Sequence, residues 1–220
     1  MILFGGLLLL ILLYKFVPVP FTPTMLFRSL EAWAQGKDAR IYYQWVSYEN
    51  IADPVKVAVV ASEDQRFPQH GGLDFAAIRQ AMEENKRRLK PRGASTISQQ
   101  VAKNVFLWQG GGYFRKALEV PITYLIEWIW GKQRILEVYL NVAEMGPQTF
   151  GVQAAAKKML NKNAASLGAL EAARIAAVLP NPKNYLIHQP NGIVIYRQNH
   201  ILYQMQLLGG ISYLKNLRKF

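Results

Sequence analysis

The sequence predicts a mainly α-helical domain preceded by one N-terminal transmembrane helix. Of its 220 residues, 51% are hydrophobic, which provides enough apolar side chains for a sizeable core. Apolar residues recur at helical spacing between capping signals over most of the chain, whereas Gly192–Tyr196 (GIVIY) gives the best strand signal. A long uncharged apolar run opens the chain, which predicts the membrane helix.

Composition narrows the classes of function. The chain has no cysteine, which excludes thiolate metal sites, a cysteine nucleophile and disulfide bonds. Its formal net charge of +12 favours a polyanion, a diphosphate or an anionic membrane surface as a partner. We therefore expect the chain to act on an anionic substrate or surface.

The N-terminal run Met1–Leu13 contains no charged residue. Extended to Val17 it would give roughly 25 Å of helix, the short end of a bilayer span, with Tyr14 and Lys15 at the headgroup level. A cleaved signal peptide is the alternative, but neither a charged leading segment nor a small-residue cleavage pattern accompanies the run. We expect an uncleaved anchor over residues 1–17.

A proline-rich stretch, VPVPFTPT, follows the anchor. Such a sequence favours an extended, semi-rigid stalk, which we assign to residues 18–24. No second linker, repeat or low-complexity tract interrupts residues 25–220. We expect this remainder to form one domain.

Helices are expected in order along the domain. Asp53-Pro54 is a cap followed by proline in the first turn, and Asp74 can cap the next helix. Thr96 with Gln99 three residues later is a candidate capping box. The expected helices are Val55–Ser62, Asp74–Leu89 with Phe75, Ile78 and Met82 on one face, Thr96–Leu107, Arg115–Met145 with breaks at Pro121 and Gly131, Gly151–Leu160, and Ser166–Leu179.

A first cluster of chemical groups follows the apolar run Val57–Ala61. Glu63 comes at the end of this run, where loss of hydration raises a carboxyl pKa towards the range of a general base. Asp64 and His70 are placed to orient it. The alternative is a surface turn in which Asp64 and Asp74 only cap helices.

A second cluster lies in GASTISQQVAKN. Gln100, Lys103 and Asn104 are neighbours on one helix face and can cradle sugar hydroxyls and phosphate. Ser95 and Thr96 stand at the helix N-terminus, where free backbone N–H groups favour an anion. An ordinary solvated face is the alternative. The stripe expected to be buried consists of Ile97, Val101, Val105 and Trp108.

Two further groups are charged. Lys86–Arg92 (KRRLKPR) is expected to be a solvated face or a membrane contact, and no nucleic-acid motif accompanies it. Arg115, Lys116 and Glu119 form either an exposed intrahelical ion pair or two cations for a diphosphate beside a second carboxylate. Ile135–Asn141 (ILEVYLN) is expected to be structural.

These clusters together resemble the motifs of the peptidoglycan glycosyltransferases, glycosyltransferase family 51. E-D-x-x-F-x-x-H-x-G-x-D at Glu63–Asp74 resembles the first motif and G-x-S-T-I-x-Q-Q-x-x-K-N at Gly93–Asn104 the second. R-K-x-x-E at Arg115–Glu119 with I-L-E-x-Y-L-N resembles the third, Gly146–Gly151 with alanines 154–156 the fourth, and LPNP at Leu179–Pro182 the last. With no penicillin-binding domain following, the pattern is similar to the monofunctional members.

One stretch departs from the family pattern. An aromatic pair and a glycine usually follow the alanines, but Met159, Leu160 and Asn161 stand here. Asn tolerates the left-handed backbone nearly as well as Gly, and Met-Leu keeps the apolar volume. We expect an effect on local packing and none on catalysis.

The resemblance implies a lysozyme-like fold with a small mobile jaw against the membrane. It implies an enzyme that transfers the growing lipid-linked glycan chain to the 4-hydroxyl of lipid II, with inversion and release of undecaprenyl diphosphate. It places the catalytic domain on the extracytoplasmic side of the bacterial inner membrane. Lipid II, the glycan chain and the bilayer are the implied partners, with other cell-wall synthesis or division proteins as candidates and no nucleic acid.

The resemblance also implies residue roles. Glu63 would accept the proton of the acceptor hydroxyl, with its geometry held by Asp64, Phe67 and His70. Lys103, Arg115 and Lys116 would stabilise the diphosphate. Glu119 matches the second essential carboxylate. The remaining expected substrate-binding residues are Ser95, Thr96, Gln100 and Asn104.

No tightly bound cofactor is expected. A divalent ion such as Mg²⁺ would assist at the diphosphate, but no residue cluster marks a dedicated metal site. A membrane-anchored lytic glycosidase on the same kind of fold is the leading alternative, although a lysine and arginine cradle has no use in that reaction. A non-catalytic glycan-binding protein is a third reading, and it would not need Glu63 and Glu119 together.

Overall fold

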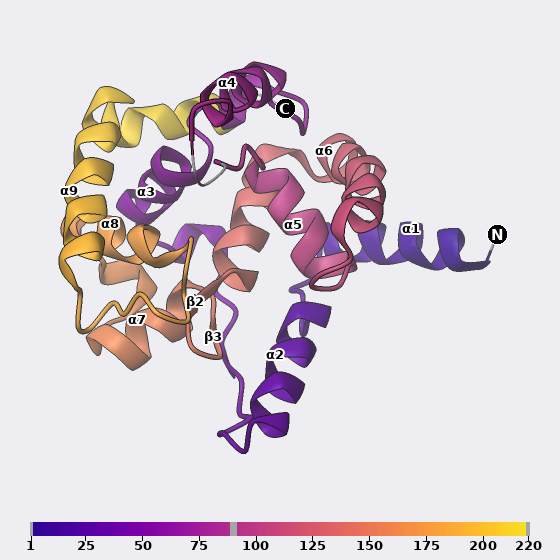
Figure 1. Cartoon of the computed structure of the whole chain (residues 1–220), viewed down its shortest axis with the longest axis horizontal. Helices are drawn as coiled ribbons and strands as arrows, with labels where there is room; N and C mark the ends of the chain where they lie inside the picture. The colour runs from indigo at the N-terminus through magenta and orange to yellow at the C-terminus, as the bar shows by residue number, and fades with distance from the viewer. Residues whose placement is uncertain (1, 89–91, 219–220) are drawn as a thin grey trace.

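The computed structural model describes residues 2–88 and 92–218, and they are mainly helical, as predicted (Figure 1). The helices are α1 Ile2–Tyr14, α2 Pro23–Ala34, α3 Asp53–Glu63, α4 Phe75–Asn85, α5 Ile97–Phe106, α6 Gly112–Val142, α7 Val152–Leu160, α8 Ala169–Val178 and α9 Gly192–Leu207. Short 3₁₀ turns are η1 Tyr48–Asn50, η2 Phe67–Gln69, η3 Ala164–Ser166 and η4 Gly210–Arg218. The strands are β1 Tyr42–Tyr43, β2 Glu144–Gly146 and β3 Thr149–Phe150.

Helix α3 is the central element of the core. Every residue from Val55 to Ala61 is buried, and α3 packs against α8, α9 and η4. A helix that is apolar on all sides is stable only when neighbours cover all of it, which explains its central place. Glu63, the last residue of α3, therefore lies at the edge of the core.

The predicted caps fix the starts of two helices that border the site. Thr96 Oγ1 accepts a hydrogen bond from Gln99 N while Gln99 Oε1 accepts one from Thr96 N, so the capping box is confirmed. Asp74 caps α4 through the amides of its first turn, also as predicted. Asp53 is not a cap: it is the first residue of α3, and its carboxylate pairs with the buried Lys56.

The long segment around α6 is broken once. Gly131 has φ 72° and ψ 169°, which is non-helical, whereas the helix continues through Pro121, where a break was also predicted. The helix ends at Val142 and not at Met145, because the next residues form β2. The part after Gly131 is buried, as expected for ILEVYLN; its fully buried apolar residues include Ile135, Leu136, Val138 and Leu140.

The strand prediction for Gly192–Tyr196 is wrong, because this segment opens α9. Asn191 caps the helix by accepting a hydrogen bond from Val194 N, and Val194 is buried while its neighbours Ile193 and Ile195 are exposed. Packing of α9 against α8 thus overrides the β-branched composition. The three strands lie elsewhere, in the order β1-β3-β2, with β1 parallel and β2 antiparallel to β3.

The departure after the alanines is accommodated locally. Asn161 ends α7 in the left-handed conformation with φ 53°, as expected of an Asn that replaces Gly. Met159 packs against Gly146, where an added Cβ would come within 2.0 Å of its Cε. A side chain at position 146 would therefore require the flexible end of Met159 to move aside. Downstream, α8 starts at Ala169, later than predicted, because η3 occupies the segment before it.

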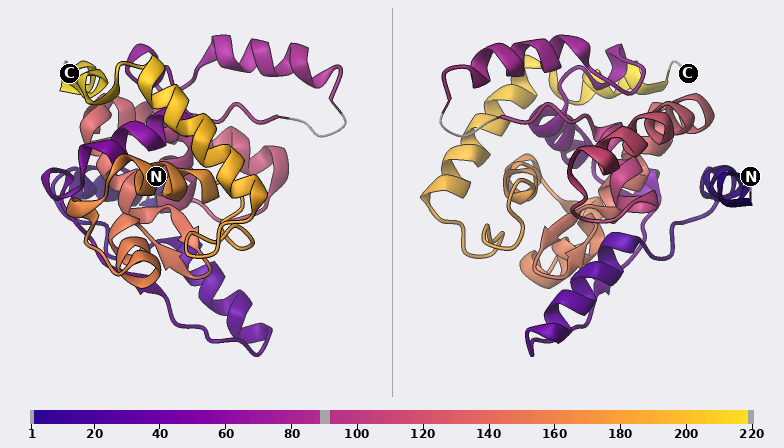
Figure 2. Two further views of the ribbon diagram at one scale, coloured as in Figure 1. Left: turned by 90° about the vertical axis from the view of Figure 1, so that its left-hand side faces the viewer. Right: turned by 45° about the vertical axis from the view of Figure 1, so that its right-hand side comes forward.

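Helix α4 lies at the upper edge of the molecule in Figures 1 and 2. It ends at Asn85, before the predicted Leu89, which lies outside the described residues. Ala81 is its one buried residue, and Phe75 and Met82 are exposed. The predicted apolar face exists, but most of it is not covered by the described parts of the chain.

The N-terminal segment forms two helices. Ile11 of α1 is buried and its carbonyl accepts a hydrogen bond from Trp130 Nε1 at 2.7 Å. The stretch assigned to the stalk is partly packed on the domain, since Val19 and Thr22 are buried and α2 already begins at Pro23. Within residues 2–88 and 92–218, no helix combines the length and apolar character of a membrane span.

Candidate active site

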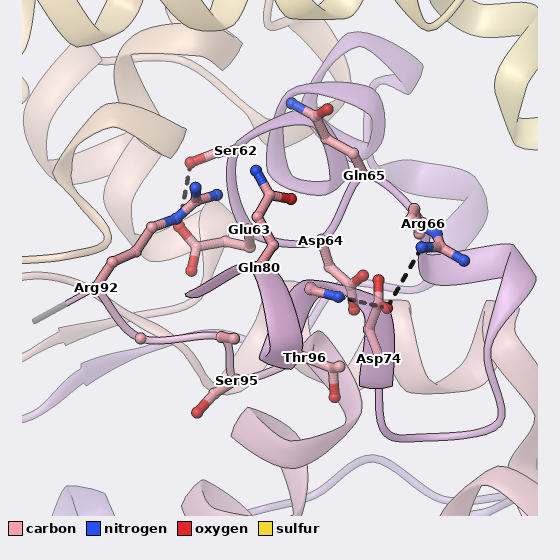
Figure 3. Close-up of a pocket in the computed structure, with 13 residues that line it drawn as sticks. Ser62, Glu63, Asp64, Gln65, Arg66, Asp74, Gln80, Arg92, Ser95 and Thr96 are labelled. Carbon is pink, nitrogen blue, oxygen red and sulfur yellow. Dashed lines mark hydrogen bonds and ion pairs between the residues drawn. The ribbon is translucent and has the colours of Figure 1, made fainter. Parts of the chain in front are cut away.

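A cleft of about 290 Å³ opens at the carboxyl end of α3 (Figure 3). Glu63 and Asp64 reach it from α3, and the loop before α5 brings Ser95 and Thr96 to the opposite wall. Its other polar lining residues are Ser62, Gln65, Arg66, Asp74, Gln80 and Arg92. The cleft therefore joins the first predicted cluster to Ser95 and Thr96 of the second, whereas Gln100, Lys103 and Asn104 do not line it.

Glu63 is the carboxylate whose surroundings suit proton transfer. Burial is the main cause that raises its pKa above the usual value, with a small contribution of the same sign from Asp64. Gln100 Nε2 donates to its Oε2 at 2.9 Å and Ser62 Oγ to its Oε1 at 3.1 Å, and both hydrogen bonds act to lower the pKa. The net pKa remains raised, as expected for a carboxylate that follows the apolar run of α3.

Asp64 holds the framework beside Glu63. Both of its oxygens lie 3.0 Å from His70 Nε2, and its Oδ2 accepts a hydrogen bond from Ile97 N at 3.0 Å. Asp64 thereby ties the end of α3 to the start of α5. Asp64 and His70 form hydrogen bonds with each other and with backbone amides, so the pair positions the chain around Glu63 without contacting its carboxylate.

Phe67 is a structural member of the first motif. Its side chain is fully buried, and the His70 ring meets it edge-on at 6.2 Å between centroids. The ammonium group of Lys132 lies 4.4 Å from the centre of the Phe67 ring. Phe67 therefore supports the motif from inside the core and does not line the cleft.

The face of α5 with Gln100, Lys103 and Asn104 is not the ordinary solvated face of the alternative reading. Asn104 is buried, and Gln100 is partly buried between Glu63 and Tyr139. Burial lowers the pKa of Lys103, and the nearby charges of Arg115 and Lys116 lower it further. Polar side chains enclosed in this way are costly to folding, which favours a role in binding or chemistry.

Trp108 does not join the buried stripe of α5. The helix ends at Phe106, so the helical spacing no longer applies two residues later, and Trp108 is 43% exposed. Ile97, Val101 and Val105 are buried as predicted. The error came from extending the helical period past the end of the helix.

Glu119 is buried beneath two cations. Its exposed fraction is 2%, Arg115 Nη1 lies 2.6 Å from its Oε2, and Lys116 Nζ contacts its Oε1. Lys116 also donates to Ser95 Oγ at 3.1 Å, which joins this cluster to the loop before α5. The intrahelical ion pair of the first alternative is therefore present, but its carboxylate is buried and not exposed.

The basic run has a different character. Lys86 pairs with Glu83, and Arg88 and Arg92 pair with Glu84, all on the exposed surface near the end of α4. Residues 89–91 of the run lie outside the described residues. This is the solvated face that was expected, although Arg92 also lines the cleft.

Three residues near Glu63 escaped the sequence analysis. Arg197 of α9 exerts an electrostatic effect on Glu63, and no sequence signal pointed to it. Tyr139 stood in a motif taken as structural, yet its hydroxyl reaches Gln100 at 3.1 Å. Ser62 is adjacent to Glu63 and donates to it. Among the described residues, no group of three His, Asp or Glu side chains is arranged to hold a metal ion.

Comparisons with known proteins agree with this arrangement. The model of the transglycosylase family matches residues 31–206. A biosynthetic peptidoglycan transglycosylase of Pectobacterium atrosepticum is 48% identical over 218 residues, which cover 98% of this chain and 89% of that protein. One of Yersinia pseudotuberculosis is 51% identical over 207 residues, covering 93% and 86%. The chain belongs to the transglycosylase family, because the family model matches most of it and the relatives share about half of its residues along nearly its whole length.

Proposed function

We propose that the protein polymerises the glycan strands of peptidoglycan from lipid II at the cell envelope. The observation that carries the proposal is a carboxylate with a raised pKa, linked through α5 to a cluster of three cations. Gln100, which binds Glu63, and Lys103 are three residues apart on α5, so they share one side of the helix. A base and a diphosphate site within one turn of helix are what glycosyl transfer from a lipid diphosphate needs.

In this reaction Glu63 takes the proton from the 4-hydroxyl of the acceptor lipid II. The hydroxyl oxygen attacks the anomeric carbon of the growing chain, and the bond from that carbon to the diphosphate breaks. Undecaprenyl diphosphate leaves with the electron pair, and attack from the opposite face inverts the anomeric configuration. A raised pKa brings a carboxylate closer to the operating pH, where general bases work best.

The cations would act on the leaving group. Lys103, Arg115 and Lys116 lie near one another, and their charges suit the negative charge that develops on the diphosphate. Glu119 would keep Arg115 and Lys116 in place. A divalent ion such as Mg²⁺, where it assists, would bind through the diphosphate, whose oxygens are the ligands that it prefers.

A lytic glycosidase also uses a carboxyl group with a raised pKa, in its case as an acid. Glycosidic bond cleavage by water releases no diphosphate, so it leaves the enclosed cations without a role. Purified lipid II and preformed glycan, each supplied in detergent, separate the two functions. A polymerase converts lipid II into long glycan strands and lipid diphosphate, whereas a glycosidase shortens the preformed glycan. A glycan-binding protein yields neither product. Polymer from the wild type, lost in Glu63→Gln, is the expected result.

We also propose that α1 holds the enzyme at the bilayer, with the catalytic domain on the extracytoplasmic side. Leu9, Leu12 and Leu13 are exposed on α1 while Ile11 packs on the domain. Replacing these three leucines with glutamine keeps the Ile11 contact. The variant is expected to polymerise lipid II in detergent but to work poorly on vesicles, and full activity on vesicles would contradict the proposal.

A further inference from the structure

Tyr139 connects the buried second part of α6 to the candidate base. It is 1% exposed, and its hydroxyl lies 3.1 Å from Gln100 Oε1. The other end of the same amide, Gln100 Nε2, lies 2.9 Å from Glu63 Oε2. The three side chains form a continuous chain of hydrogen bonds from the core to the cleft.

The amide of Gln100 has a donor end and an acceptor end, so its orientation decides what Glu63 meets. With the NH₂ group towards Glu63, the amide stabilises the carboxylate. Turned by half a rotation, it would place its oxygen against the carboxylate and repel it. In the observed orientation the Tyr139 hydroxyl donates to the amide oxygen. After the rotation it could only accept from the amide N–H, and the amide oxygen would face Glu63.

We propose that Tyr139 is a positioning residue, whose hydroxyl holds the Gln100 amide with its N–H groups towards Glu63. The proposal rests on the proposed role of Glu63 as the base. It differs from a packing role, because the Tyr139 ring alone, as in phenylalanine, would fill the same space without fixing the amide.

The other groups around Glu63 do not replace this contact. Arg197 on α9 and Asp64 at the end of α3 act on it through their charges, and Arg66 and Arg92 line the same cleft. Within the described residues, Ser62 is the one other side chain that donates a hydrogen bond to the Glu63 carboxylate. Burial raises the pKa of Tyr139 well above its usual value, so its hydroxyl stays neutral and able to donate.

The test is the pH profile of lipid II polymerisation in detergent for Tyr139→Phe. We expect kcat at neutral pH to fall about ten-fold, the equivalent of one hydrogen bond to a charged group, with KM nearly unchanged. Loss of the oriented N–H raises the pKa of Glu63, so the acid limb of kcat moves to higher pH. The deficit should therefore shrink as the pH rises.

Tyr43→Phe is the matched control, because its hydroxyl also donates to an oxygen, the Val19 carbonyl, but not to Gln100. It should keep the wild-type profile. Gln100→Met should move the acid limb in the same direction, and adding Tyr139→Phe to it should move the limb no further. A loss of stability would lower kcat equally at every pH. The pH profile therefore distinguishes it from a change in the pKa of Glu63.

A Tyr139→Phe deficit that is constant with pH, or no deficit at all, would overturn the proposal. So would a further shift on adding Tyr139→Phe to Gln100→Met. Glu63→Gln separates these failures from failure of the proposed function. If Glu63→Gln polymerises normally, Glu63 is not the base. If it is inactive and Tyr139→Phe has the wild-type profile, the positioning role alone is wrong.

Discussion

Glu63 and Glu119 are the two carboxylates of the proposed site, and they have opposite kinds of partner. Glu63 at the end of α3 receives hydrogen bonds from the neutral side chains of Gln100 and Ser62, and burial raises its pKa. Glu119 on α6 is covered by the guanidinium of Arg115 and the ammonium of Lys116. The comparison teaches that two buried carboxylates differ through their partners, because one accepts hydrogen bonds from neutral groups and the other holds two cations.

The largest effect is expected for Glu63→Gln, which tests the role of the first carboxylate. The amide cannot accept the proton of the acceptor hydroxyl, so polymerisation of lipid II should fall about a hundred- to ten-thousand-fold. Initial rates in detergent, with folding checked by circular dichroism, measure it. Glu83→Gln, which changes an exposed carboxylate paired with Lys86, should have the wild-type rate. Near-normal turnover of Glu63→Gln would remove Glu63 from the chemistry.

The cation side is tested by Lys103→Met, which removes the ammonium group and keeps most of the apolar stem. Turnover should fall about ten- to a hundred-fold. This loss is smaller than the one expected when a single donor stabilises a developing charge, because Arg115 and Lys116 remain. Arg87→Ala, an exposed cation of the basic run, should change detergent turnover little and weaken binding to anionic vesicles. Equal losses of detergent turnover in both variants would show that overall charge, and not the cluster, is responsible.

Glu119→Gln tests the second carboxylate, which holds Arg115 and Lys116. We expect a smaller loss, about ten-fold, because the variant loosens Arg115 and Lys116 without removing a cation or the base. The kinetic signature should be a lower kcat with an acid limb at the wild-type pH. An acid limb that moves as in Tyr139→Phe would mean that Glu119 acts on the base and not only on the cations.

The smallest expected effect is on stability, and its sign should differ between the two carboxylates. The folded-state pKa of Glu63 lies above its usual value of 4.5, so folding is favoured by protonation below that value and loses this contribution as the pH rises through the raised pKa. At neutral pH, Glu63→Gln should therefore unfold at the wild-type temperature or above it. Glu119→Gln should lose about 1–2 kcal/mol, or roughly 2–8 °C, because Arg115 and Lys116 lose their common anion and Lys116 is partly exposed.

Calorimetry at pH 7 measures both changes. A lower melting temperature for Glu63→Gln would mean that its hydrogen bonds to Gln100 and Ser62 outweigh its loss of hydration. That result would reverse the contrast between the two sites.

The sequence by itself determined the helical class and the capped starts of α4 and α5. Local rules were sufficient there: a capping box involves residues three apart, and an apolar helix such as α3 has to lie at the centre. The ordered motifs also predict Glu63, Lys103 and Glu119 as site residues, and these roles stay predictions.

Only the tertiary structure decided which groups are buried and which side chains of other elements they touch. That Glu119 is buried, that Tyr139 reaches Gln100, and that Gly192–Tyr196 forms a helix depend on how α6 packs on α5 and α9 on α8. A sequence pattern records the spacing of residues within one element, whereas burial and hydrogen-bond partners arise where two elements meet. Gln100 reaches Glu63 from another helix, whereas Arg115 and Lys116 lie on the same helix as Glu119. For Glu119 the fold therefore decided the burial, and the spacing along α6 decided the partners.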